Sequence, residues 1–127
     1  MANPHLRLEI ADRVARLTLA RPGQMNTMSP AFWRELDAAL AALQRDAPAR
    51  VLVLDSTGKH FSAGMALEAF SSSIALDDSS AAARANIAVM LADMQRTFDR
   101  LAELRMPVLA AIQGGCIGGG VDLVCAA

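Results

Sequence analysis

The sequence predicts an α/β fold in a single domain. Three observations support this: apolar runs typical of strands at 51–54 and 107–112, apolar positions at helical spacing before each run, and a glycine-bearing loop directly after each run. Strands that alternate with amphipathic helices indicate a sheet covered by helices. A chain of 127 residues can bury one compact core but leaves little room for a second.

The opening residues predict a β-hairpin. Residues 6–10 alternate apolar and polar side chains, Asp12 and Arg13 have the character of a turn, and residues 14–19 resume the extended pattern. The residues Arg21, Pro22 and Gly23 then end the second strand.

An amphipathic helix is expected from Pro30 to Asp46. Ser29 is a typical N-cap residue, and proline is favoured at the first helical position. The apolar residues that recur at helical spacing are Phe32, Leu36, Leu40 and Leu43.

The second half predicts two buried strands separated by a long helix. The run 51–54 suits a strand buried on both faces, and 107–112 suits another. A stretch rich in Ser, Ala and Asp spans 71–83, after which a long helix is indicated. The residues that mark this helix are Ile87, Leu91, Met94, Phe98 and Leu101.

Composition and charge exclude several classes of partner. The net charge of −1, with Lys59 as the only lysine and eleven scattered arginines, gives no basic field for nucleic acid and no polybasic membrane anchor. No segment has the ~18 apolar residues needed to span a bilayer. The first residues lack the pattern of a leader, so we expect a cytoplasmic setting. Cys116 and Cys125 do not combine with His5 and His60 in the spacing of a metal site, so no metal is expected.

The two glycine-bearing loops are the candidates for chemistry. Each follows an expected strand, the first at 61–65 and the second at 114–120. Glycine permits positive φ and close approach to the backbone, and a helix that begins after the second loop would present free N–H groups to an oxyanion. The glycines could equally serve only tight turns between helix and sheet.

The sequence lacks the motif residues of nucleotide-binding proteins and of serine hydrolases. The glycine run has no Gly-x-Gly-x-x-Gly in register after the first strand and no Gly-Lys-Ser/Thr for a nucleotide phosphate. A Gly-x-Ser-x-Gly elbow is absent, and neither histidine has a sequence context that identifies it as the base of a hydrolase triad.

Three segments, in order, resemble the enoyl-CoA hydratase/isomerase, or crotonase, family. They are Arg21-Pro22 with Asn26, then Phe-Ser-Ala-Gly at 61–64, then the segment 107–120. Within that family, the residues at 116–123 and Phe-Trp-Arg-Glu at 32–35 resemble the Δ3,5-Δ2,4-dienoyl-CoA isomerase branch. The resemblance spans nearly the whole chain.

The resemblance implies a superhelix of ββα turns, of which residues 1–127 would be the N-terminal part of one domain. It implies that an acyl-CoA thioester lies between the two glycine loops, with the backbone N–H groups of Met65 and Gly119 as an oxyanion hole. The residues that would contact the thioester and its coenzyme A are Ala63, Gly64, Met65, Ala66, Leu67, Gly119 and Gly120. Ala66 departs from the family, which commonly has aspartate there.

Asp122 is the candidate catalytic carboxylate by the same resemblance, placed in the first turn of a helix and directed at a buried acyl chain. Aspartate here favours the shift of 3,5-dienoyl-CoA to 2,4-dienoyl-CoA in fatty-acid β-oxidation, whereas hydratases have glutamate. Since a proton shuttle needs further groups, these should lie beyond Ala127, and the chain alone is expected to be inactive.

Two other functions stay open: an enoyl-CoA hydratase, and a noncatalytic acyl-CoA-binding or assembly module. Coenzyme A would enter only as part of the substrate, with no separate cofactor. Relatives commonly form trimers or dimers of trimers, and the resemblance implies the same here.

Overall fold

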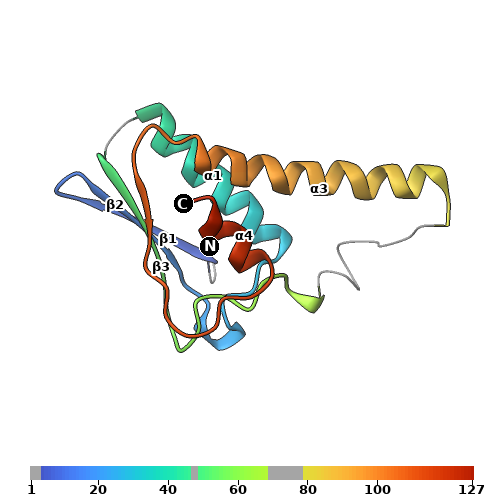
Figure 1. Cartoon of the computed structure of the whole chain (residues 1–127), viewed down its shortest axis with the longest axis horizontal. Helices are drawn as coiled ribbons and strands as arrows, with labels where there is room; N and C mark the ends of the chain where they lie inside the picture. The colour runs from blue at the N-terminus through green and yellow to red at the C-terminus, as the bar shows by residue number, and fades with distance from the viewer. Residues whose placement is uncertain (1–3, 47–48, 69–78) are drawn as a thin grey trace.

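The computed structural model describes residues 4–46, 49–68 and 79–127, and shows one sheet with helices packed against it (Figure 1). Most of the Ser-, Ala- and Asp-rich stretch at 71–83 lies outside the described residues. The elements are β1 (Leu6–Ala11), β2 (Val14–Leu19), the 3-10 helix η1 (Pro22–Gln24), α1 (Pro30–Asp46), β3 (Val51–Ser56), α3 (Ala81–Ala102), β4 (Val108–Ala110) and α4 (Gly119–Cys125).

The predicted hairpin is confirmed. Strands β1 and β2 pair antiparallel, with Leu6 opposite Leu19 and Ala11 opposite Val14. The two turn residues, Asp12 and Arg13, both adopt left-handed φ values, +50° and +64°. Two consecutive left-handed residues match the right-handed twist of the flanking strands, which is why such turns close tight hairpins.

The order of strands in the sheet positions the functional loops. The order is β1-β2-β3-β4, and β2, β3 and β4 run parallel to one another. Because the carboxyl ends of parallel strands meet at the same edge, the chain after β3 and the chain after β4 emerge side by side. Both predicted glycine loops begin at that edge.

Helix α1 forms as predicted and supplies much of the core. Its expected apolar face is fully buried, at Phe32, Leu36, Leu40 and Leu43. It faces the equally buried strand residues Leu17, Leu19, Leu52 and Leu54. Full burial of one such side chain contributes about 1.5–3 kcal/mol relative to exposure, so this contact is a principal source of stability.

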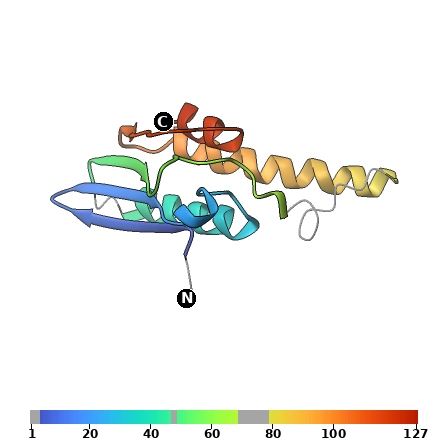
Figure 2. The same cartoon turned by 90° about the horizontal axis from the view of Figure 1, so that it is seen from below.

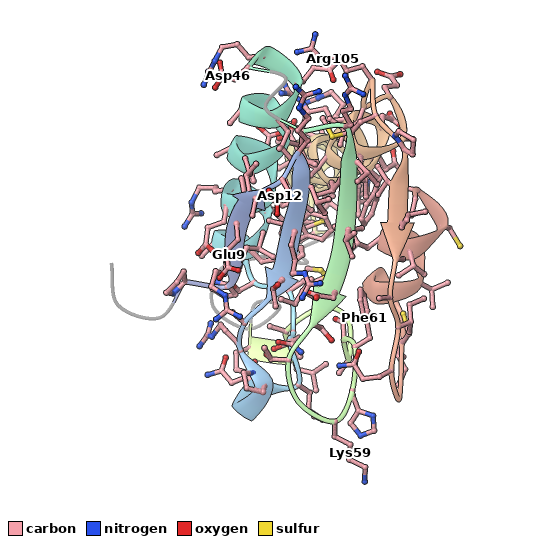
Figure 3. All side chains as sticks on the ribbon, turned by 90° about the vertical axis from the view of Figure 1, so that its left-hand side faces the viewer. Glu9, Asp12, Asp46, Lys59, Phe61 and Arg105 are labelled. Atoms are coloured by element: carbon pink, nitrogen blue, oxygen red, sulfur yellow. The ribbon has the colours of Figure 1, made fainter. Side chains whose placement is uncertain are left out.

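The prediction that both later strands are buried on both faces is wrong. In β3, Leu52 and Leu54 are completely buried, whereas Val51 and Val53 are only half-buried. Strand β4 is short, and Leu109 on it is 58% exposed. The reason is that helices cover one face: in Figure 3 the strands lie in front and α1 and α3 lie behind them.

Helix α3 begins where Ser80 caps it by accepting a hydrogen bond from the N–H of Ala83 at 3.1 Å. The predicted apolar stripe is present but unevenly buried, because Leu101 is fully covered and Leu91 is 49% exposed. The C-terminal part of α3 therefore anchors the helix on α1. Among the described helices, none is long and apolar enough to cross a membrane.

Candidate active site

The two glycine loops are joined by backbone hydrogen bonds. Phe61 N–H donates to the carbonyl of Gly115 at 2.9 Å, and Ile117 N–H donates to the carbonyl of Ser62 at 3.1 Å. Ser62 and Cys116 form an isolated parallel bridge. Segments more than fifty residues apart in sequence thus form one rigid edge beyond the sheet.

Gly64 makes the closest contact between these loops. Its φ is +85°, and a Cβ at this position would lie 2.7 Å from the Ile117 carbonyl oxygen and 3.2 Å from the Gly119 nitrogen. Only glycine fits such a backbone, for both conformational and steric reasons. The glycine is therefore needed for close approach as well as for a turn.

The predicted oxyanion donors have no partner among the described residues where the loops meet. Three nearby N–H groups are used: Gly64 donates to Ser62 Oγ at 3.1 Å, Ala66 to the Met28 carbonyl at 2.9 Å, and Gly120 to the Ile117 carbonyl at 3.0 Å. The N–H groups of Met65 and Gly119 make no hydrogen bond to another described residue. Gly119 also begins α4, whose N-terminus carries the positive end of the helix dipole.

A third segment, residues 25–28, holds the first glycine loop from its other side. Met28 N–H donates to the Gly64 carbonyl at 2.8 Å, and Ala63 N–H donates to the Met25 carbonyl at 3.0 Å. Figure 2 shows the green segment after β3 lying between this light-blue segment and the red segment that leads into α4. Backbone bonds therefore support the loop at Ala66, where the family commonly has aspartate.

Comparison with known proteins shows the family of this chain. The family model described as "Enoyl-CoA hydratase/isomerase" matches residues 9–127. The chain belongs to this family. Over 117 residues it is 41% identical to the mitochondrial Delta(3,5)-Delta(2,4)-dienoyl-CoA isomerase of Mus musculus, covering 89% of this chain and 35% of that protein.

Solved structures of the family share the fold. A probable enoyl-CoA hydratase from Mycobacterium thermoresistibile superposes with a TM-score of 0.79 at 32% identity, covering 96% of this chain and 46% of the other. A putative enoyl-CoA hydratase from Streptomyces coelicolor gives 0.80 at 31%, covering 100% and 45%. The expected crotonase-like fold is confirmed, and the chain spans less than half the length of these relatives.

The expected cytoplasmic setting is wrong by the same comparison. The mouse and human dienoyl-CoA isomerases are named mitochondrial, and the one from Arabidopsis thaliana is named peroxisomal. Compartment is set by address signals that receptors read, not by the fold, so the composition of the domain carries no information on it.

Of the residues predicted to contact the ligand, some line a hollow and one is buried between the loops. Ala63, Met65, Ala66 and Leu67 line a hollow of about 710 Å³ beside the first loop, and Leu67 is 80% exposed. Gly120 is buried instead, since a Cβ there would lie 3.2 Å from the Ser62 Cβ, and its N–H is already bonded. Gly120 therefore packs the loops together, and its contact with the ligand stays a prediction.

Asp122 lies in the first turn of α4, as predicted. Its side chain is exposed, however, while its neighbour Leu123 is buried in the core. The face of α4 that packs on the core carries Leu123, and the catalytic role of Asp122 stays a prediction.

Cys116, beside the second glycine loop, has no feature of a nucleophile. Burial raises the pKa of its thiol, and the nearby Cys125 raises it further. A raised pKa leaves the thiol protonated and unreactive at neutral pH. Among the described residues, no group of three or more His, Cys, Asp or Glu is placed to hold a metal ion.

Ser62 links the segments that build the loop. It is completely buried, its Oγ donates to the Asn26 carbonyl at 2.9 Å, and the same oxygen accepts from Gly64 N–H at 3.1 Å. Because Ser62→Ala leaves both backbone groups without this partner, we expect a loss of about 1–3 kcal/mol in the free energy of unfolding. Urea denaturation measures it. Ser80→Ala, which removes an exposed helix cap, should cost about 1 kcal/mol, and a smaller loss in Ser62→Ala than in this control would contradict the role of Ser62.

The side-chain cluster around His5 was not predicted from the sequence. His5, near the N-terminus, is 7% exposed, and its Nε2 lies 2.8 Å from Ser29 Oγ and 2.6 Å from Arg21 Nη1. Its Nδ1 lies 3.1 Å from Glu35 Oε1. Ser29 precedes α1 as predicted, but its hydroxyl contacts His5. The contact joins residues 24 positions apart, so no local pattern reveals it.

Proposed function

We propose that the protein acts on acyl-CoA thioesters and shifts the double bonds of a 3,5-dienoyl-CoA to the 2,4 positions. The observation that carries this proposal is the pair of N–H groups, those of Met65 and Gly119, that have no partner among the described residues at the meeting point of two rigid loops. Such a pair suits the oxygen of a thioester carbonyl. The identity to dienoyl-CoA isomerases from several organisms supports this choice of substrate.

The proposed reaction proceeds through an enolate. Removal of a proton from the acyl chain moves negative charge through the conjugated system onto the thioester oxygen, where two fixed N–H donors stabilise it. Losing one such donor typically costs about 3–4 kcal/mol of transition-state stabilisation. Hydrogen bonds fix Gly64 and Ala66, and they thereby hold the Met65 N–H between them in place. The donor therefore needs little reorganisation as charge develops on the thioester oxygen.

Asp122 is the proposed acid/base carboxylate. It lies three residues after the Gly119 donor on α4, and its exposed side chain is open to a bound ligand. A proton must leave one carbon and another must reach a different carbon, so a second acid/base group is needed. We propose that this group lies outside residues 1–127, and that the full assembly is a trimer or dimer of trimers.

The decisive assay follows ultraviolet absorbance with a 3,5-dienoyl-CoA and the polypeptide that contains this chain with the remaining family length. We expect conversion to the 2,4-dienoyl product, slowed about 100-fold or more by Asp122→Asn because the general acid/base is removed. Asp99→Asn, an exposed change on α3, is the matched control and should retain the wild-type rate. Equal rates in all three proteins would remove Asp122 from the mechanism.

An enoyl-CoA hydratase is the second proposed function. A probable enoyl-CoA hydratase from Rhizobium meliloti is 32% identical over 97% of this chain and 44% of that protein. Hydration of a 2-enoyl-CoA, with the dienoyl substrate left unchanged, would replace the isomerase assignment. A noncatalytic acyl-CoA-binding or assembly module is the third possibility, and calorimetry with an acyl-CoA on the 127-residue chain tests it. Acyl-CoA binding without turnover of either substrate would indicate such a module.

A further inference from the structure

The cluster around His5 has the connectivity of a nucleophile, a base and an orienting carboxylate. Ser29 Oγ lies 2.8 Å from one ring nitrogen of His5, and Glu35 Oε1 lies 3.1 Å from the other. A hydroxyl within hydrogen-bond distance of an imidazole that is itself held by a carboxylate is the general arrangement for nucleophilic catalysis by serine. Neither the enolate chemistry nor the glycine loops use these residues.

The hydrogen bonds decide which nitrogen of His5 can act as a base. A carboxylate only accepts hydrogen bonds, so the Nδ1 that faces Glu35 carries the ring proton. The single lone pair is then on Nε2, which lies within hydrogen-bond distance of both the Ser29 hydroxyl and the guanidinium of Arg21. Glu35 is in turn fixed, because its Oε2 accepts from the backbone N–H groups of His5 and Leu6 at 2.8 and 3.0 Å.

The surroundings of Ser29 favour negative charge on its oxygen. Ser29 immediately precedes α1, a helix of 17 residues whose N-terminal dipole stabilises anions. Arg21 Nη1, 2.6 Å from Nε2, brings a positive charge to the same place. Ser29 is also one of the residues that line the hollow of about 710 Å³, together with Met65 and Ala66.

From these contacts we propose that Ser29, His5 and Glu35 form a second reactive site, which transfers acyl groups from activated esters or thioesters to Ser29. His5 Nε2 takes the hydroxyl proton as the bond from Ser29 Oγ to the acyl carbon forms. Once Nε2 is protonated, Arg21 loses its acceptor there and donates to the oxyanion on that carbon. The bond to the leaving group breaks, the leaving group takes the proton from Nε2, and water later releases the acid by the same steps.

The test is covalent labelling of the folded 127-residue protein with a fluorophosphonate, which loses fluoride as the serine oxygen bonds to phosphorus. Peptide mass spectrometry should find the adduct on Ser29, and urea-unfolded protein should remain unlabelled. We expect His5→Gln to lower the labelling rate by about 100-fold or more, since the general base is lost. Glu35→Gln should also lower it, because the ring loses its orienting charge.

Matched controls are Ser80→Ala and Glu103→Gln, exposed changes that should label at the wild-type rate, with circular dichroism to confirm that each variant is folded. The wild-type result alone is sufficient to overturn the proposal: folded protein without an adduct on Ser29 shows that these contacts only fasten β1 to α1. An adduct whose rate is unchanged in folded His5→Gln also overturns it. The labelling needs no acyl-CoA, so its outcome is independent of the isomerase assay.

Discussion

Gly64→Ala should destabilise the protein and weaken acyl-CoA binding at the same time. The new methyl group would lie 2.7 Å from the Ile117 carbonyl oxygen and 3.2 Å from the Gly119 nitrogen, and the backbone would keep a φ of +85°. A left-handed alanine costs about 1–2 kcal/mol before any clash is counted. Relief of the clash must move Gly119, one of the two proposed oxyanion donors. We expect at least about a tenfold loss in acyl-CoA affinity, or ~1.4 kcal/mol, measured by calorimetry.

The matched control is Gly23→Ala, because a Cβ at Gly23 would meet nothing within 4 Å and its φ is not left-handed. Thermal unfolding should leave Gly23→Ala near the wild-type midpoint and lower that of Gly64→Ala by several degrees. If Gly64→Ala kept the wild-type affinity, the two loops would not meet at an acyl-CoA site, and the proposed oxyanion pair would be wrong.

Phe61→Ala should produce the largest loss of stability. Phe61 is completely buried, and Figure 3 shows it just beyond the end of β3, whereas Lys59 at the tip of the same loop points into solvent. Truncating a buried phenylalanine to alanine typically costs about 3–5 kcal/mol. A domain of this size is stable by only about 5–15 kcal/mol. Urea unfolding, followed by the fluorescence of Trp33, measures the change.

The control for Phe61→Ala is Phe61→Leu, which retains most of the apolar volume and should cost less than about 1.5 kcal/mol. A loss in Phe61→Ala no larger than in this control would mean that the loop does not rely on the core for its position. A large loss would show that the same side chain secures both the core and the segment bearing the oxyanion donor.

Local patterns are sufficient to predict the hairpin and the helix α1 of this protein. The hairpin follows from alternation around Asp12 and Arg13, and α1 follows from Ser29-Pro30 and the spacing of its apolar residues. The extent of burial is predicted less well. The runs at 51–54 and 107–112 are apolar enough for two covered faces, yet the described helices lie over one face, because burial depends on which elements reach each face of the sheet.

Some features of the candidate site could likewise be predicted from the sequence, and others could not. The glycine loops and their family resemblance are enough to single out Met65, Gly119 and Asp122 as candidates, since those residues lie in contiguous motifs. The exposure of Asp122 and the packing role of Gly120 depend on how α4 sits on the core, which the sequence of α4 does not reveal.

The sequence by itself determined the fold class, the order of the elements and the family, because these depend on short-range periodicity and contiguous motifs. Only the tertiary structure decided that the N–H groups of Met65 and Gly119 lack a partner among the described residues, and that Ser29, His5 and Glu35 form one hydrogen-bonded chain. These features depend on angstrom-scale distances between residues far apart in sequence, and parallel strand pairing together with core packing sets those distances.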